Sequence, residues 1–182
     1  MAKHSMICHP DTPAKTVDEF TVDVERNKNN RIWVRYHVEA PVDALELGFP
    51  REAQRRDGLW KTTCFEAFVK EVGNPDYLEF NFAPSSEWAA YSFSGYREGM
   101  SDLPMSVAPE LGNDSSQSHF ALEADFELPR TFADKDLLLA LTAVIKELDG
   151  TKSYWSLAHP TSSPDFHHPD CFTLHLPAPA QP

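Results

Sequence analysis

Cysteine is scarce in this chain of 182 residues, which has three: Cys8, Cys64 and Cys171. The count is odd and no two of them form a CxxC motif, which argues against a disulfide scaffold and against a zinc knuckle. A free cysteine behaves as a small hydrophobic residue. We therefore expect Cys64 and Cys171 to be buried thiols in a protein of a reducing compartment.

Long apolar runs are also missing. No stretch approaches the roughly 20 consecutive apolar residues of a membrane span. The N-terminal sequence MAKHSMICHPDTPAK has no apolar core of the kind found in a signal peptide. These absences predict a cytoplasmic location and no membrane partner.

Positive charge is in short supply. The chain has 16 Lys and Arg against 28 Asp and Glu, which gives a formal net charge of −12. Nucleic acids and anionic membrane surfaces attract basic proteins, so this balance argues against both as the main partner. The length suits one domain of ordinary size with a real core. A small polar molecule is the partner that we expect, and the oligomeric state stays open.

The segment 59–100 shows the clearest pattern in the chain. Along YLEFNF, residues 77–82, apolar side chains alternate with more polar ones, which is typical of a strand with two different faces. The apolar face is predicted to pack into the hydrophobic core. The other carries Glu66, Glu79 and Asn81 among aromatic residues, and we predict a binding surface there.

The rest of the chain repeats this strand pattern between turn signals. Segment 137–148 is strongly apolar and suits a helix or a buried strand, and its neighbours favour the strand. The overall prediction is an all-β fold, an antiparallel two-sheet β-sandwich over residues 17–176, with a flexible arm at 1–16 and a disordered tail at 177–182. The other expected strands are 17–25, 31–39, a short 103–107, 119–128, 154–159 and 171–176, with a loop at 109–118.

Three segments stand out together: LWKTTCFEAFV, YLEFNFAPSSEWAAYSFSGYREGM and YWSLAHPTSSPDFHHPDCF. They resemble the bacterial DOMON-like domains, which are similar to family 9 carbohydrate-binding modules. The resemblance covers roughly Phe20 to Leu176. It implies a β-sandwich that binds haem or sugars in a pocket over one sheet.

The resemblance also implies roles for particular residue types. In the sugar modules, paired tryptophans hold a sugar ring, and Trp60, Trp88 and Trp155 are available here. In the haem-binding relatives, an axial methionine pairs with a histidine or lysine, and Met100 or Met105 matches the methionine.

We predict a non-catalytic domain that binds a small polar ligand, most plausibly a carbohydrate. Sugar recognition combines flat rings, which stack on the apolar face of the sugar, with planar polar groups that bind its hydroxyls. An ordinary solvated sheet face is the competing interpretation. The predicted ligand-binding residues are Trp60, Glu66, Glu79, Asn81, Tyr96, Arg97, Trp155, His159 and His168.

Three other interpretations stay open. Glu66 and Glu79 could serve as the acid–base pair of a glycoside hydrolase. A haem or metal-binding redox module is the alternative from a different class, with Met100 opposite His167 or His168 as axial ligands. The loop HPTSSPDFHHPD could also supply metal ligands or close over a ligand. We expect neither a bound metal nor a required cofactor; the metal-ligand candidates are His159, Asp165, His167, His168 and Asp170.

Overall fold

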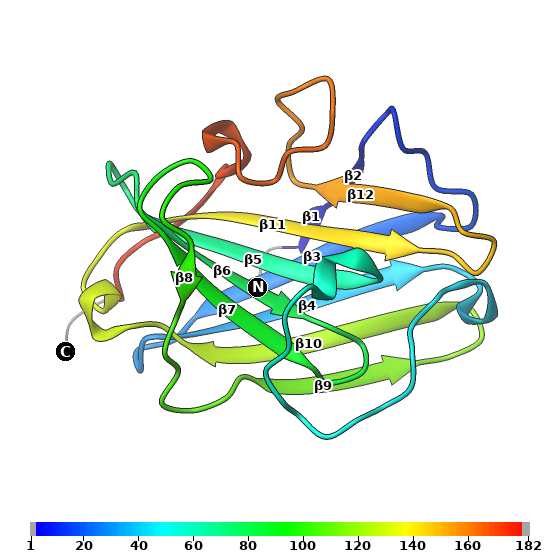
Figure 1. Cartoon of the computed structure of the whole chain (residues 1–182), viewed down its shortest axis with the longest axis horizontal. Helices are drawn as coiled ribbons and strands as arrows, with labels where there is room; N and C mark the ends of the chain where they lie inside the picture. Colours follow the sequence, from blue (N-terminus) through cyan, green and yellow to red (C-terminus); the bar gives the residue numbers. More distant parts are fainter. Residues whose placement is uncertain (1–2, 180–182) are drawn as a thin grey trace.

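Two antiparallel sheets pack face to face as a β-sandwich in the computed structural model, which describes residues 3–179 (Figure 1). Every strand pairing is antiparallel. Across the first sheet the order is β1 (Lys3–Ser5), β3 (Glu19–Arg26), β4 (Arg31–Glu39), β10 (His119–Glu127) and β9 (Glu110–Ser115). Across the second sheet it is β2 (Ile7–Cys8), β12 (Lys152–Ser156), β11 (Leu137–Lys146), β5 (Cys64–Glu71), β6 (Tyr77–Phe82), β7 (Trp88–Phe93) and β8 (Ser101–Asp102), with β13 (Leu174–Leu176) paired to β11. The predicted fold class is confirmed.

The main core fills the space between the sheets. Alternation along each strand sends every second side chain inward, as on β4, where the residues at 32, 34, 36 and 38 are fully buried. Aromatic contacts join the two layers. Phe126 of β10 lies 4.3 Å from Phe80 and 5.3 Å from Phe82 of β6 between ring centroids.

The second sheet is buried on its outer face as well. A second apolar cluster covers that face and includes Leu59, Phe68, Tyr77, Phe166 and Phe172. A strand that is buried on both faces needs no polar alternation. This explains why segment 137–148, ambiguous in sequence, forms the ten-residue strand β11 and not a helix.

Helical residues are confined to short 3-10 turns in the described part of the chain. No helix within residues 3–179 is long and apolar enough to cross a membrane. The four turns are η1 (Val42–Ala44), η2 (Leu59–Lys61), η3 (Arg130–Phe132) and η4 (Pro169–Cys171).

The segment that we expected to be a flexible arm contributes a strand to each sheet. Lys3–Ser5 pairs with β3, and Ile7–Cys8 pairs with β12. Short edge strands are held by backbone hydrogen bonds, so their side chains carry little signal. At the other end, the amide of Ala178 donates to Asp136 at 2.8 Å. Residues 180–182 of the expected tail lie outside the described residues.

Two further expectations were wrong in detail. Segment 109–118 was expected to be a loop, but Glu110–Ser115 forms β9 at the edge of the first sheet. Its polar composition reflects exposure at the edge and not a turn. The strand expected at 103–107 lies instead at Ser101–Asp102, paired with β7.

Candidate functional site

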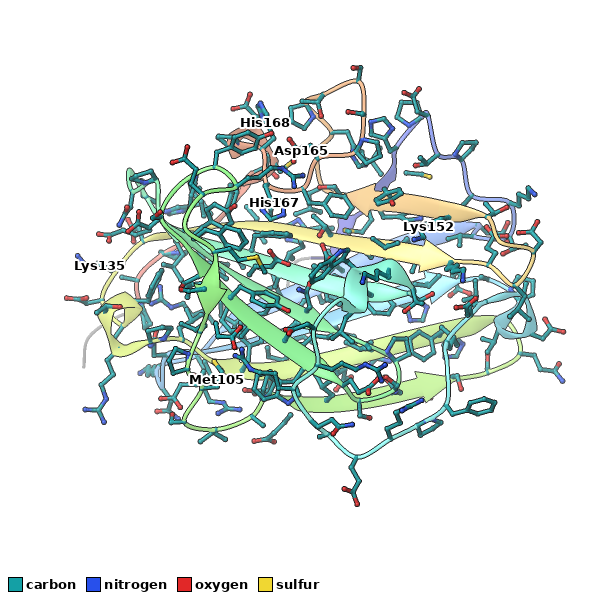
Figure 2. The ribbon with its side chains drawn as sticks, viewed as in Figure 1. Met105, Lys135, Lys152, Asp165, His167 and His168 are labelled. Carbon is teal, nitrogen blue, oxygen red and sulfur yellow. The ribbon has the colours of Figure 1, made fainter. Side chains whose placement is uncertain are left out.

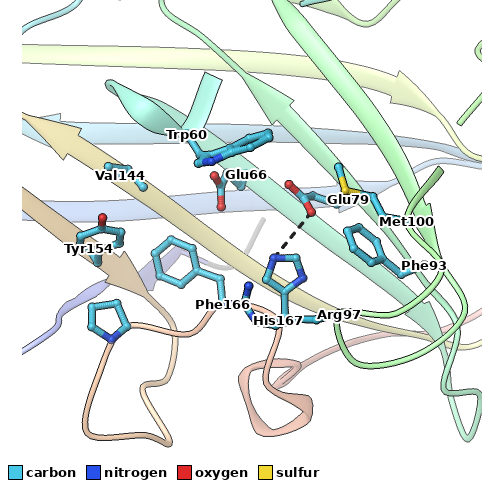
Figure 3. A pocket seen from close by; sticks show the side chains of 11 residues that line it. Trp60, Glu66, Glu79, Phe93, Arg97, Met100, Val144, Tyr154, Phe166 and His167 are labelled. Carbon is cyan, nitrogen blue, oxygen red and sulfur yellow. Dashed lines mark ion pairs between the residues drawn. The ribbon is translucent and has the colours of Figure 1, made fainter. Parts of the chain in front are cut away.

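A cavity of about 360 Å³ lies over the outer face of the second sheet (Figure 3). Strands form its floor, and three segments far apart in sequence form its walls: η2, the turn after β7, and the loop after β12. Its lining is mixed. Aromatic rings come from Trp60, Phe93, Tyr154 and Phe166, polar groups from Glu66, Glu79, Arg97 and His167, and the remaining contacts from Met100, Val144 and Pro164.

Two carboxyl groups form the floor. Glu66 of β5 pairs with Asn81 of β6, so Glu79, two residues earlier, is its diagonal neighbour on the same face. In Figure 3 both carboxyl groups point into the space that the aromatic rings surround. From the main core, Tyr36 donates its hydroxyl to the Glu66 carbonyl at 2.6 Å, which fixes the strand beneath this floor.

Side chains of the sheet hold each floor carboxyl by hydrogen bonds, with the Cys64 thiol also beside Glu66. Thr142 donates to Glu66 Oε2 at 3.1 Å. The amide of Asn81, fully buried beneath the cavity, donates to Glu79 Oε1 at 2.7 Å. Burial raises the pKa of Glu66 above the ordinary range, and the nearby Glu79 charge raises it further. Burial likewise raises the pKa of Glu79, although Asn81 and Arg97 partly oppose it.

The buried pair predicts a pH-dependent stability. Because the folded-state pKa of both carboxyls lies above the ordinary value of about 4.3, folding favours their protonated form. That stability is present in full below the unfolded pKa and is lost as the pH rises through the raised folded pKa. We expect the Tm of the protein to fall by roughly 4–8 °C from this pair between about pH 5 and pH 9, a loss of about 2 kcal/mol.

Thermal unfolding followed by circular dichroism checks this expectation. The Glu66→Gln variant removes one charge and keeps the shape, so its Tm should depend less on pH than that of the unchanged protein. The difference between the two profiles isolates the pair from the other titrating groups. Parallel profiles would contradict the assignment.

His167 reaches the cavity in its neutral form. Burial, together with the Arg97 charge, lowers the pKa of His167 to about 4. The Tyr77 hydroxyl lies 2.7 Å from His167 Nδ1 and accepts the Arg97 backbone N–H at 3.2 Å. We infer that Tyr77, whose pKa burial raises to about 12, donates its proton to Nδ1. The Nε2–H of His167 then points toward Glu79 Oε2, 3.9 Å away, and the contact is not an ion pair at neutral pH.

An ion pair joins two of the walls. Arg97 Nη2 donates to Asp165 Oδ1 at 2.7 Å, and the Tyr96 hydroxyl donates to the other oxygen of Asp165. Arg97 has φ 55°, a left-handed conformation that is costly for a residue with a side chain. Gly99, at φ 62°, completes the turn, since a Cβ there would collide with the Ser94 side chain. The turn after β7 therefore holds Arg97 in a strained backbone conformation.

The N-terminal segment holds the same loop from its other end. His9 is buried, and its Nε2 lies 3.2 Å from the Thr161 carbonyl. His159 Nε2 lies 2.8 Å from the Ile7 carbonyl, and the rings of His9 and His159 meet edge to face at 4.8 Å. In Figure 1 this segment runs beside the loop after β12. The loop that walls the cavity is thus anchored at both ends.

The structure brings four of the nine predicted binding residues to the cavity lining: Trp60, Glu66, Glu79 and Arg97. Asn81 lies beneath the floor and orients Glu79. Tyr96, about half exposed, lies outside the lining and contacts it through Asp165. These six residues therefore lie in or next to the cavity.

The other three predicted residues lie elsewhere. Trp155 points into the main core, where its ring packs 5.5 Å from Phe20. His159 contacts the N-terminal segment. His168 caps η4, where its Nδ1 accepts the Asp170 N–H at 3.2 Å. We had expected all three side chains to bind the ligand, but their contacts place them outside the cavity lining.

Alternation explains one of these differences. Tyr154 and Trp155 are neighbours on β12, and it is Tyr154 that faces the cavity while the larger ring faces the core. His167 lines the cavity while the adjacent His168 turns away (Figure 2). The parity of β12 was readable from its pairing partner β11, but that pairing was not known from sequence. Phe93, Phe166 and Pro164 carried no sequence signal of their own.

The haem interpretation receives partial geometric support. Met100 and His167 line the same cavity, but Met105 packs against the main core, away from both histidines in Figure 2. A haem pocket is large and apolar, whereas this cavity has two carboxyl groups as its floor. The residues present do not fit a porphyrin.

The metal interpretation also lacks a converging set of ligands. Across residues 3–179, no group of three or more His, Cys, Asp or Glu side chains could hold a metal ion. The candidates in the loop have separate contacts. Asp165 binds Arg97, His167 faces the cavity and His168 caps η4.

Comparisons with known proteins concern the fold. No family model matches the chain, and no curated protein matches it. Among solved structures, a proposed carbohydrate-binding protein from Bacteroides uniformis is similar, with a TM-score of 0.66 and 16% sequence identity. The similarity covers 94% of this chain and 84% of that one. At this identity the likeness establishes a shared all-β sandwich fold.

Proposed function

We propose that this protein binds a carbohydrate in the cavity over the second sheet, without chemical conversion. The observation that carries the proposal is the lining itself. Aromatic rings stand on the walls, and carboxyl, imidazole and guanidinium groups reach the same space. Rings of this kind stack on the apolar face of a sugar, and such polar groups bind its hydroxyls in pairs.

Three further observations support the proposal. The cavity size falls within the range of small-molecule sites, about 300–1,000 Å³. The walls are held by the Arg97–Asp165 pair and by the N-terminal segment, so little ordering is needed on binding. The neighbour from Bacteroides uniformis shares the fold, and carbohydrate binding is the role proposed for it. From the resemblance of its three sequence segments, together with the sandwich fold, we also propose that the chain is a relative of the DOMON-like domains.

A fluorescence titration tests the proposal, because Trp60 alone of the four tryptophans lines the cavity. We expect one sugar of a mono- and oligosaccharide panel to give a saturable change in tryptophan emission. Trp60→Ala should weaken binding roughly tenfold, about 1.4 kcal/mol. Trp33→Phe, on the outer face of the first sheet, is the matched control and should leave affinity unchanged. A panel without any saturable response would overturn the proposal.

A glycoside hydrolase is the second candidate, favoured by one observation. Burial keeps a floor carboxyl protonated at neutral pH, as a general acid requires. The same sugars therefore serve as a test of turnover. Release of reducing ends by the unchanged protein, lost in Glu66→Gln, would replace binding with catalysis.

A further inference from the structure

We propose that the ligand of this cavity is an amino sugar, with its ammonium group seated between the carboxyl groups of Glu66 and Glu79. The inference rests on the proposed function and names the substrate class of the same site. It is carried by the geometry of the floor, by the absence of a Lys or Arg paired with it among residues 3–179, and by the aromatic walls.

The first argument concerns the oxygen atoms that the sheet leaves free. Thr142 occupies Glu66 Oε2, and Asn81 occupies Glu79 Oε1. Apart from the Cys64 thiol, a weak donor beside the Glu66 carboxyl, no side-chain hydrogen bond of the described residues reaches Glu66 Oε1 or Glu79 Oε2, and neither atom is sealed away from the cavity. Both residues line the cavity. One oxygen of each carboxyl is thus open to a ligand with several donors, which an ammonium group supplies.

The second argument concerns charge. Two acidic side chains that are 3% and 5% exposed need a compensating cation or must hold protons. The nearest guanidinium, Arg97, is engaged by Asp165 at 2.7 Å, and His167 is neutral for the reasons given above. Within residues 3–179, no Lys or Arg forms an ion pair with either glutamate. A ligand cation would fill the place that the protein leaves empty.

The third argument concerns the walls. Trp60, Tyr154 and Phe166 border the cavity above the floor. Aromatic faces attract cations through their quadrupole and also stack on sugar rings. A neutral sugar would use these rings and could hydrogen-bond to the carboxyl groups, but it would supply no cation to compensate their charge when they ionise. An amine without a sugar ring would use the charges and leave most of the aromatic wall uncovered. An amino sugar uses both.

Ligand binding should then move protons. The cation stabilises the ionised carboxylates, so their pKa falls on binding and the proton that the pair holds at neutral pH passes to the buffer. The other titratable groups facing the pair are Cys64, Tyr77, Tyr91 and Tyr154 from the strands and Arg97, Asp165 and His167 from the walls. Burial raises the pKa values of Cys64, Tyr77 and Tyr91, so these three groups stay protonated at neutral pH. The released proton therefore comes from the glutamates.

Isothermal titration calorimetry with glucosamine, N-acetylglucosamine and glucose tests the inference. At neutral pH we expect glucosamine to bind at least tenfold more tightly than the other two, with a heat that depends on the buffer's ionisation enthalpy. Glu66→Gln and Glu79→Gln should each remove this preference, so that glucosamine and glucose bind each variant with affinities within threefold of one another. Glu87→Gln is the matched control, since Glu87 is a buried glutamate paired with Arg56 outside this cavity.

A measurement on the unchanged protein tests the inference without relying on variants that could fail to fold. Lowering the pH to about 5 keeps the amine charged but protonates the floor, so glucosamine affinity should fall about tenfold while glucose affinity stays constant. The β-1,4-linked disaccharide of glucosamine is compared with glucosamine itself. Tighter binding of the disaccharide would identify the end of a glycan as the source, and tighter binding of the monosaccharide a free amino sugar. Glucose that binds as tightly as glucosamine would overturn the inference and keep the proposed function. No detectable binding of any of these sugars would overturn both the inference and the proposed function.

Discussion

Replacing Phe126 with alanine is expected to lower the free energy of unfolding by about 3–5 kcal/mol, which corresponds to a fall in Tm of roughly 6–20 °C for a domain of this size. Phe126 is fully buried, and its ring meets Phe80 and Phe82 of the opposite sheet. Its removal leaves a void between the two layers that tightly paired strands cannot close. The cost therefore includes both the lost burial and the cavity.

Chemical denaturation and thermal scans of the purified variant measure this loss. Phe49→Ala is the matched control. It makes the same chemical change at the surface, because the Phe49 side chain is 84% exposed. We expect the control to stay within about 0.5 kcal/mol of the unchanged protein. A Phe126→Ala variant as stable as the control would mean that the sheets do not pack through this ring.

Replacing Asp165 with alanine is expected to have the largest effect on binding among single changes outside the cavity lining. Asp165 accepts hydrogen bonds from Tyr96 and Arg97, and its Oδ1 lies 3.3 Å from the backbone nitrogen of His167. Without it the loop after β12 loses its connection to the turn after β7. Arg97 then becomes free to turn toward the floor carboxylates. We expect affinity for the bound sugar to fall more than tenfold.

Hydrogen–deuterium exchange separates this effect from general unfolding. Residues 157–173 should exchange faster in Asp165→Ala, while β5 and β6 keep their protection. Asp149→Ala is the control, since it also removes an ion pair with a cation, Lys15, but at an exposed position. Unchanged exchange in the loop, together with unchanged affinity, would show that the Arg97–Asp165 pair does not hold the wall.

Much of the fold could be predicted from alternation alone. The faces of β5 and β6 were assigned correctly, with Phe65 and Phe80 inward and Glu66 and Glu79 outward. Side-chain parity is local, so a single strand reveals it. Edge strands were missed for the opposite reason. β1, β2 and β9 are held by backbone pairing with distant strands, and neither their composition nor their spacing indicates this.

The site was predictable only in its floor. Glu66, Glu79 and Asn81 share one local pattern, whereas the walls come from η2, the turn after β7 and the loop after β12. Which residue of such a loop faces inward depends on contacts over more than 60 residues, such as Arg97 with Asp165. The choice between His167 and His168, or between Tyr154 and Trp155, needed that information.

The division of the cavity into a floor of strands and walls of loops has an evolutionary consequence. Changes in the floor alter residues that are buried in a sheet with cores on both sides, so most of them should be lost through instability. Changes in the wall loops leave the strand pairings of the sheet in place, and loops accept insertions and new side chains readily. Descendants of such a domain could therefore exchange one ligand for another by remodelling three short segments while inheriting the same sandwich.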